Sequence, residues 1–148
     1  MEWVKALKQG QIVALDTAPL IYFIEEHPTY LPIVVDFFEK LDRGEIKVVT
    51  SVITLSEVLV VPLRNGNIQL AQQYRDILLN VKGLTTLEIS VAIAEKAAHL
   101  RSQYSLRTPD AIQIATALLN NATVLLTNDI RFPVLSELQI LVLDNFLP

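Results

Sequence analysis

Hydrophobic and polar positions divide this chain into two kinds of segment. Short apolar runs rich in β-branched residues are typical of buried strands, and they alternate with longer segments whose apolar residues recur at helical spacing. The predicted strands cover residues 12–15, 46–50, 84–89, 123–126 and 141–143, the last extending back to 139. The predicted helices cover residues 2–8, 18–26, 31–41, 52–64, 67–81, 90–104 and 108–119. This alternation predicts an α/β fold with a central parallel sheet of about five strands and helices on both faces.

Two of the predicted helices have unusual apolar patterns. The helix at 31–41 carries an apolar stripe wider than one core contact needs. Residues 58–63 are apolar on every side, which predicts burial all round, and Pro62 predicts a kink or an early end of that helix. By contrast, Thr108-Pro109-Asp110 is a regular helix start, with a hydroxyl at the N-cap, proline at the first helical position and an acid in the first turn.

The composition limits the class of protein. A chain of 148 residues suits one domain, 1–148, in which residues 1–10 form a short N-terminal extension. Asp, Glu, Lys, Arg or Gln interrupts every apolar run before the roughly 18–20 residues of a membrane span, and the start lacks the pattern of a signal peptide, so we expect a cytoplasmic protein. Because the chain has no cysteine, disulfides, thiolate zinc sites and cysteine nucleophiles are excluded.

Four acids stand directly after predicted strands or early in predicted helices: Asp16, Glu57, Asp110 and Asp129. Each has a structural explanation by itself. Asp16 can cap a helix, Glu57 can complete a capping box that begins at Thr54, Asp110 can favour the positive end of a helix, and Asp129 can be a turn residue.

Taken together, these acids indicate a site. A parallel sheet brings the carboxyl ends of its strands to one edge, where ligands bind. Carboxylates held close together raise one another's pKa and destabilise the fold unless protons or cations neutralise them. Mg²⁺ or Mn²⁺ suits this role, because hard cations take carboxylate oxygens. The net charge of −4 argues against nucleic-acid binding by bulk attraction, but a bound cation reverses the local charge.

Four motifs, in this order and at these spacings, resemble those of PIN-domain ribonucleases, and most closely the VapC-like toxins of type II toxin–antitoxin systems. The resemblance runs from Ile12 to Leu143, nearly the whole chain. The motifs are Leu15-Asp16-Thr17, Thr54-Leu55-Ser56-Glu57-Val58, Thr108-Pro109-Asp110-Ala111-Ile112-Gln113-Ile114-Ala115 and Leu126-Thr127-Asn128-Asp129-Ile130-Arg131-Phe132. The segment before the first strand is longer than in many members of this family.

The resemblance implies a function. Asp16, Glu57, Asp110 and Asp129 match the family's acidic quartet, which holds metal, and Thr127 matches its usual Thr or Ser, so these five are the expected catalytic residues. The implied activity is that of a Mg²⁺- or Mn²⁺-dependent endoribonuclease whose cut leaves a 5′-phosphate and a 3′-hydroxyl. Such a toxin inhibits translation or growth and is neutralised by an antitoxin protein. We expect the apolar faces at 31–41 and 58–63 to serve a homodimer and the antitoxin.

Four neighbours of the quartet are candidate substrate-binding residues. Arg107 and Arg131 could reach a phosphate at the rim, although surface arginines are usually only solvated. Thr17 and Asn128 could orient a ligand or a water, and Thr17 could equally cap a helix.

Two other functions compete with this one. A catalytically inactive PIN-like module would bind RNA or protein without cutting, which the presence of all four acids argues against. A phosphohydrolase of the haloacid-dehalogenase type needs a second Asp two residues after Asp16, where Ala18 stands, and a receiver domain needs an acidic pair before the first strand's site. The chain also has no glycine-rich phosphate loop.

Overall fold

The computed structural model describes residues 2–148 and contains one sheet of five parallel strands. The strands are β1 (Ile12–Leu15), β2 (Lys47–Ser51), β3 (Leu84–Leu87), β4 (Val124–Thr127) and β5 (Gln139–Val142), in the spatial order β3-β2-β1-β4-β5. The helices are α1 (Glu2–Lys5), α2 (Thr17–Ile24), α3 (Leu31–Asp42), α4 (Val52–Arg64), α5 (Ile68–Asn80), α6 (Val91–Gln103) and α7 (Thr108–Leu119), with a 3₁₀ turn, η1, at Leu143–Phe146. The predicted α/β fold with a parallel sheet is confirmed.

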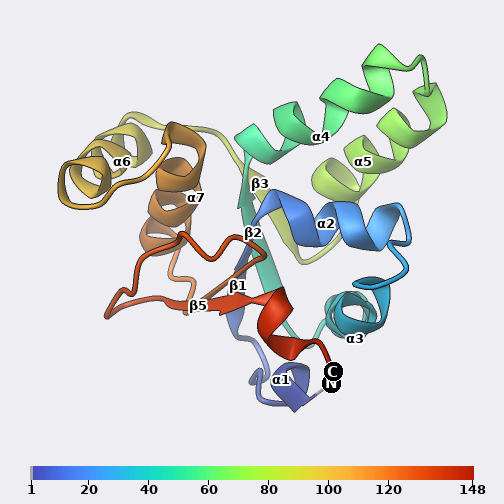
Figure 1. The fold of residues 1–148 in the computed structure, drawn as a ribbon, viewed down its shortest axis with the longest axis horizontal. Coiled ribbons are helices and arrows are strands. Elements are labelled where there is room, and N and C mark those ends of the chain that lie inside the picture. Colours follow the sequence, from blue (N-terminus) through green and yellow to red (C-terminus); the bar gives the residue numbers. More distant parts are fainter. Residues whose placement is uncertain (1) are drawn as a thin grey trace.

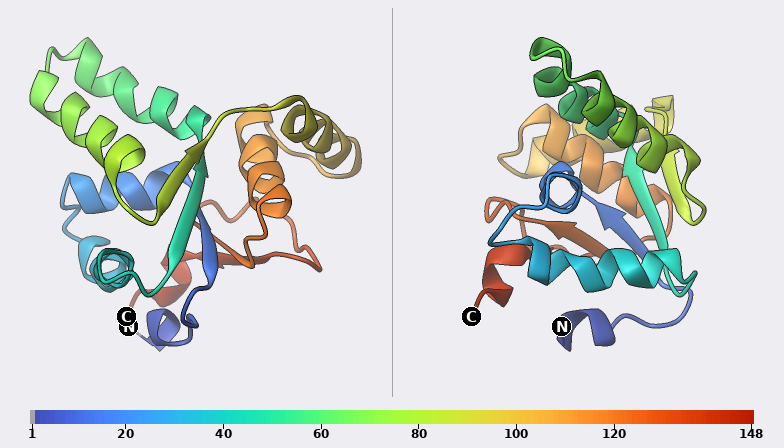
Figure 2. Two further views of the ribbon diagram at one scale, coloured as in Figure 1. Left: turned by 180° about the vertical axis from the view of Figure 1, so that it is seen from behind. Right: turned by 90° about the vertical axis from the view of Figure 1, so that its right-hand side faces the viewer.

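Helices cover both faces of the sheet. Successive strand residues point to opposite faces, so Val13 and Leu15 of β1 belong to one apolar cluster and Ala14 to the other. The first cluster is formed with helices α1 to α5, and the second with α6 and α7. Figures 1 and 2 show α6 and α7 on one side of the sheet and α2 to α5 on the other.

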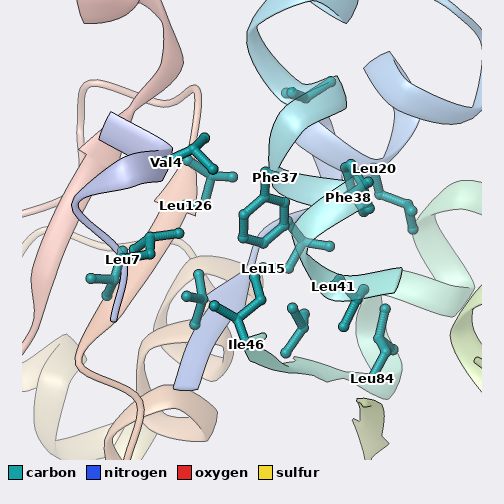
Figure 3. Packing of buried hydrophobic residues seen from close by; sticks show 14 of the residues in the cluster. Val4, Leu7, Leu15, Leu20, Phe37, Phe38, Leu41, Ile46, Leu84 and Leu126 are labelled. Atoms are coloured by element: carbon teal, nitrogen blue, oxygen red, sulfur yellow. The ribbon is translucent and has the colours of Figure 1, made fainter. Parts of the chain in front are cut away.

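The first cluster contains the aromatic core of the molecule. Phe37 of α3 is buried against Leu15 and Leu126 of the sheet, and Phe38 of the same helix lies beside Leu20 (Figure 3). The wide apolar stripe at 31–41 is therefore largely used within this chain, because its buried residues face the chain's own core. They are Ile33, Val34, Phe37, Phe38 and Leu41.

Three local expectations are corrected. Helix α1 ends at Lys5 rather than residue 8, although Trp3, Val4 and Leu7 of the N-terminal segment do pack into the first cluster. Helix α7 begins at Thr108 itself, and its N-cap Arg107 makes no capping hydrogen bond through its side chain.

Helix α4 differs more from its prediction. It continues past Pro62 to Arg64, and only a stripe at four-residue spacing, Thr54, Val58 and Pro62, is buried. Val61 is 55% exposed and Leu63 62% exposed, so burial all round was wrong. An unbroken apolar run has no periodicity, and the sequence therefore cannot show which of its sides faces the core.

The strand order places a topological switch point between β1 and β4. From β1 the chain proceeds to β2 and β3 on one side, whereas β4 and β5 lie on the other. In open parallel sheets the carboxyl ends of two such strands form the crevice in which ligands bind. None of the helices described for residues 2–148 is long and apolar enough to cross a membrane.

Candidate active site

The switch point joins Asp16, which follows β1, to Thr127, the last residue of β4. The Thr127 hydroxyl donates to Asp16 Oδ2 over 2.7 Å, and the backbone N–H of Thr17 donates to Asp16 Oδ1 over 2.8 Å. Asp16 is thus the N-cap of α2, as expected, and also faces the neighbouring strand. Thr127 Oγ1 in turn accepts a hydrogen bond from the Asp129 backbone N–H at 3.1 Å. One buried hydroxyl therefore connects two of the four acids.

Glu57 is not part of a capping box. The N-cap of α4 is Ser51, whose hydroxyl accepts from the Ile53 N–H at 3.2 Å, and this puts Glu57 in the second turn. Its Oε1 accepts a hydrogen bond from the Thr17 hydroxyl at 2.9 Å. Thr17 therefore contacts two of the acids: its backbone N–H donates to Asp16 and its hydroxyl donates to Glu57.

A buried polar network lies beneath this contact. Gln113 Nε2 of α7 donates to Thr54 Oγ1 over 2.6 Å, and the hydroxyls of Thr54 and Thr50 are 3.0 Å apart. The Thr17 hydroxyl reaches the same Thr54 oxygen at 3.5 Å. These hydrogen bonds hold α4 and α7 in place relative to β1 and β2. The buried network therefore also fixes the rotamer of Thr17.

The other two acids are paired with arginines. Arg107 donates from Nε to Asp110 Oδ2 (3.0 Å) and from Nη2 to Asp110 Oδ1 (3.3 Å). Arg131 donates from Nη2 to Asp129 Oδ2 (2.6 Å), and its backbone N–H donates to Oδ1 (2.9 Å), so Asp129 is a turn residue as well as a cleft residue. Arg107 Nη2 also lies 3.9 Å from Asp129 Oδ2.

All four acids line one cleft of about 630 Å³. Four more residues expected from the sequence line it too: Thr17, Arg107, Asn128 and Arg131. Thr127 lies beneath the cleft, with no exposed surface. The structure therefore brings all nine predicted site residues to one place.

Sequence reasoning missed two cleft residues with polar side-chain groups, Tyr22 and Asp144. Asn128 joins them, because its Nδ2 donates to Tyr22 Oη (3.1 Å) and its Oδ1 accepts from the Asp144 backbone N–H (2.9 Å). Asp144 follows an apolar strand, β5, as Asp16 follows β1, so the signal was present in the sequence. Tyr22 carries no such signal, since an aromatic residue on an apolar helix is usually core.

The electrostatics of the acids differ. Burial raises the pKa of Asp16 above its usual value; the hydrogen bonds from Thr127 and Thr17 oppose this shift, and the negative charges of Asp110 and Glu57 add to it. The hydrogen bonds from Arg131 hold the pKa of Asp129 below its usual value, with help from the charge of Arg107. The side of the cleft at Asp16 thus carries uncompensated negative charge.

The carboxylate groups of the cleft are the type of ligand that a divalent cation prefers. Four carboxylates supply hard oxygen ligands. The pKa of Asp16 is raised mainly by burial, and the charges of Asp110 and Glu57, which a cation would neutralise, add to this shift. Among residues 2–148, however, no three His, Asp or Glu side chains are placed so that they could hold one ion together. Both oxygens of Asp110 and of Asp129 accept from arginines instead, so a cation here would exchange with those contacts.

Comparison with known proteins gives the family. The model of the PIN domain matches residues 13–138, and the chain belongs to the PIN-domain family. This family comprises nucleases and includes the toxins of toxin–antitoxin systems. Among proteins with a curated function, none matches this chain in sequence.

Solved structures with the same fold include toxins and toxin–antitoxin complexes. A toxin–antitoxin complex from Klebsiella pneumoniae is 26% identical, with a TM-score of 0.64 over 85% of this chain and 94% of that one. VapBC2 from Rickettsia felis, bound to a DNA fragment from its promoter, is 22% identical, with a TM-score of 0.67 over 89% of this chain and 98% of that one. VapC20 from Mycobacterium tuberculosis, a toxin that cleaves the sarcin–ricin loop, is 14% identical, with a TM-score of 0.61 over 76% and 86%. The chain thus shares the fold of these toxins.

Proposed function

We propose that this protein is a metal-dependent endoribonuclease and the toxin of a toxin–antitoxin pair, which inhibits translation or growth by hydrolysing RNA. The observation that carries the proposal is the convergence of four carboxylates in one cleft at the switch point of a PIN fold. The toxin–antitoxin complexes among its structural neighbours support the second part.

The acids would hold Mg²⁺ or Mn²⁺ through Asp16, Glu57, Asp110 and Asp129. A cation held there would lower the pKa of a water in the cleft and would offset negative charge on the phosphate. Thr127 orients Asp16 through its hydroxyl, and Thr17 does the same for Glu57. Hydrolysis of the phosphodiester would leave a 5′-phosphate and a 3′-hydroxyl.

The arginines are candidate phosphate ligands. Guanidinium groups bind phosphate oxygens in the same forked geometry as carboxylates, so Arg107 and Arg131 can exchange Asp110 and Asp129 for an RNA phosphate. Their side chains are 61% and 65% exposed, which leaves them accessible from solvent. This supplies local positive charge to a chain whose net charge is −4. Asn128 and Thr17 act by fixing cleft side chains, since their own polar groups are bonded to Tyr22 and Glu57.

Two protein partners belong to this proposal, a cognate antitoxin and a second copy of the chain. The exposed apolar residues of α4, Val60, Val61 and Leu63, support an interface of one of these kinds. A toxin that cuts cellular RNA acts in the cytoplasm, which is where we place the protein.

A cleavage assay tests the proposal directly. End-labelled structured and single-stranded RNAs are incubated with the purified chain in Mg²⁺, Mn²⁺ or EDTA, beside the Asp16→Asn variant. We expect metal-dependent products with 5′-phosphate ends that disappear in the variant. Identical behaviour of variant and wild type, under conditions where a known ribonuclease of this family cuts, would reject the activity.

The alternative function is a PIN-like module that binds RNA or protein without cutting. The pairing of Asp110 and Asp129 with arginines favours it, because those carboxylates are then already neutralised. The two functions differ in their metal affinity. A calorimetric titration with Mn²⁺ gives binding that Asp110→Asn weakens if the site is catalytic, and no binding if the arginine pairs are permanent.

A further inference from the structure

One aromatic side chain lines the cleft and has no part in the proposed hydrolysis. Tyr22, near the C-terminal end of α2, lines the cleft. Its ring stacks on that of Tyr30, with the centroids 4.2 Å apart and the planes within 12°. His27 packs against both rings, at centroid distances of 5.2 Å and 4.9 Å. We call Tyr22 and Tyr30 the tyrosine pair.

Hydrogen bonds from the cleft side hold both rings in place. Asn128 Nδ2 donates to Tyr22 Oη over 3.1 Å, and Tyr30 Oη donates to Asp144 Oδ1 over 2.6 Å. Asn128 and Asp144 are themselves joined, since the Asp144 N–H donates to Asn128 Oδ1 over 2.9 Å. The rings are therefore fixed before any ligand arrives, and a planar ligand that stacked there would not have to order them.

The tyrosine pair differs in burial from Tyr74, a tyrosine with a purely structural role. Tyr74 is fully buried in the core, and its hydroxyl is bonded to the Glu25 carboxylate. Tyr22 and Tyr30 pack on the edge of the same core but stay partly exposed. Their hydroxyls are bonded to Asn128 and Asp144, both of which line the cleft. Tyr22 itself forms part of the cleft wall, and Tyr30 supports it by stacking on its ring.

The position of the pair fits a nucleotide next to the bond that is cut. Asp16 caps α2 and Tyr22 follows six residues later, which is about 9 Å along a helix that rises about 1.5 Å per residue. Unpaired bases bind proteins by stacking on aromatic side chains. Both hydrogen bonds from Tyr30 and Asn128 to the Asp144 carboxylate end on Oδ1, so Oδ2 can accept from the amino group of a base.

We propose that the tyrosine pair is a stacking platform for one base of single-stranded RNA beside the scissile phosphate, and that Asp144 accepts a hydrogen bond from that base. The proposal rests on the proposed function, because it assigns a substrate subsite to the same cleft. It makes Tyr22 a substrate-binding residue and leaves the hydrolysis to the acids.

Binding to the Asp16→Asn chain tests the platform without cleavage. The anisotropy of a fluorescein-labelled single-stranded RNA, measured in Mg²⁺, gives Kd for chains carrying in addition Tyr22→Leu, Tyr22→Phe or Tyr104→Leu. We expect Tyr22→Leu to raise Kd about tenfold or more, as the loss of a stacked base does. Tyr22→Phe keeps the ring and should cost less than about threefold on the same scale. Tyr104 is a partly buried tyrosine outside the cleft, and its replacement should leave Kd unchanged.

An abasic scan separates stacking from altered folding. A single abasic nucleotide is moved along the RNA, and we expect one position where it weakens binding to the Asp16→Asn chain but has no further effect in Tyr22→Leu. Equal abasic effects in both chains, or equal losses in Tyr22→Leu and Tyr104→Leu, would overturn the proposal. If Tyr22→Leu fails to fold, photocrosslinking of 5-iodouridine RNA to the Asp16→Asn chain decides, and adducts found only outside residues 17–30 would reject the platform.

The two proposals fail in different ways. A chain that cuts RNA with metal, and whose KM is unaffected by Tyr22→Leu, retains the proposed function and loses only the platform. A chain that neither cuts nor binds RNA loses both.

Discussion

Thr127 illustrates how much one buried hydroxyl can do at this site. It donates to Asp16 and accepts from the Asp129 N–H, and its side chain is excluded from solvent. A hydroxyl can be donor and acceptor at once, and Thr combines this with the β-branched shape that a strand residue favours. The geometry of two acids from different segments therefore depends on this residue.

Replacing Thr127 by Val should separate shape from hydrogen bonding. Thr127→Val keeps the branched side chain but leaves the Asp129 N–H and one Asp16 oxygen without their partner. We expect RNA cleavage to fall about 10- to 100-fold, as for other groups that orient metal ligands. The free energy of unfolding should fall by about 1–3 kcal/mol. Thr127→Ser, which retains the hydroxyl, is the control, and equal cleavage by the Val and Ser variants would mean that the hydroxyl does not orient Asp16.

Asp16 should destabilise the metal-free protein at neutral pH. Because its pKa is raised in the folded state, the folded chain binds more protons than the unfolded chain between the two pKa values, and stability falls as pH rises through that window. Asp16→Asn removes this titration. In EDTA, urea unfolding should therefore show the variant equal to or more stable than wild type at pH 7, with the difference shrinking towards pH 4. A large loss of stability at pH 7 would mean that Asp16 is above all a helix cap.

The four acids could be placed from sequence because each follows a strand or lies in the first turns of a helix, and the other five predicted site residues are their neighbours along the chain. The ion-pair partners of these residues could not be predicted from sequence. The pairing of Arg107 with Asp110 and of Arg131 with Asp129 depends on side-chain rotamers that no sequence pattern specifies. Asp144 followed the same pattern as Asp16, but it became recognisable as a cleft residue only once the sheet order placed β5 next to β4.

At the scale of elements, the strands matched their predictions within two residues, since buried β-branched runs flanked by polar residues leave little choice. Helices were less well determined where tertiary contacts decide their ends. The shortest, α1, has one turn of helix followed by a non-helical segment, and its position is fixed by packing. Trp3 lies between Phe37 of α3 and Phe146 of η1, with centroids 5.9 Å and 5.4 Å away.

Trp3 should therefore stabilise the fold although it belongs to a segment expected as an extension. It is 8% exposed, and truncation of a buried Trp to Ala costs about 3–5 kcal/mol. Trp3→Phe should cost clearly less, because it retains a ring and removes an indole N–H that has no partner within residues 2–148. Urea unfolding followed by circular dichroism gives both values. A single transition in each variant would support one domain over 1–148, whereas unchanged stability in Trp3→Ala would make α1 a detachable extension.

At the scale of the whole molecule, the α4–α5 hairpin extends beyond the sheet (Figures 1 and 2). It exposes apolar side chains: besides Val61 and Leu63 of α4, Ile68 at the start of α5 is 77% exposed. Because contiguous exposed apolar surface often belongs to an interface, we predict that this hairpin contacts a partner. The simplest partner for this surface is a second copy of the chain, because a homodimer needs no other protein.

Light scattering coupled to gel filtration tests this interface. At micromolar concentration without a partner, the wild-type chain should have about twice the mass of one chain, because contact with a second copy removes these exposed apolar side chains from water. Val61→Glu should shift the mass to that of the monomer, because it introduces two charges into a symmetric apolar contact. Val91→Glu, at an apolar position of α6 that is 76% exposed, should leave the dimer intact. A wild-type monomer would reject the homodimer and leave this surface to the antitoxin, whose binding Val61→Glu should then weaken.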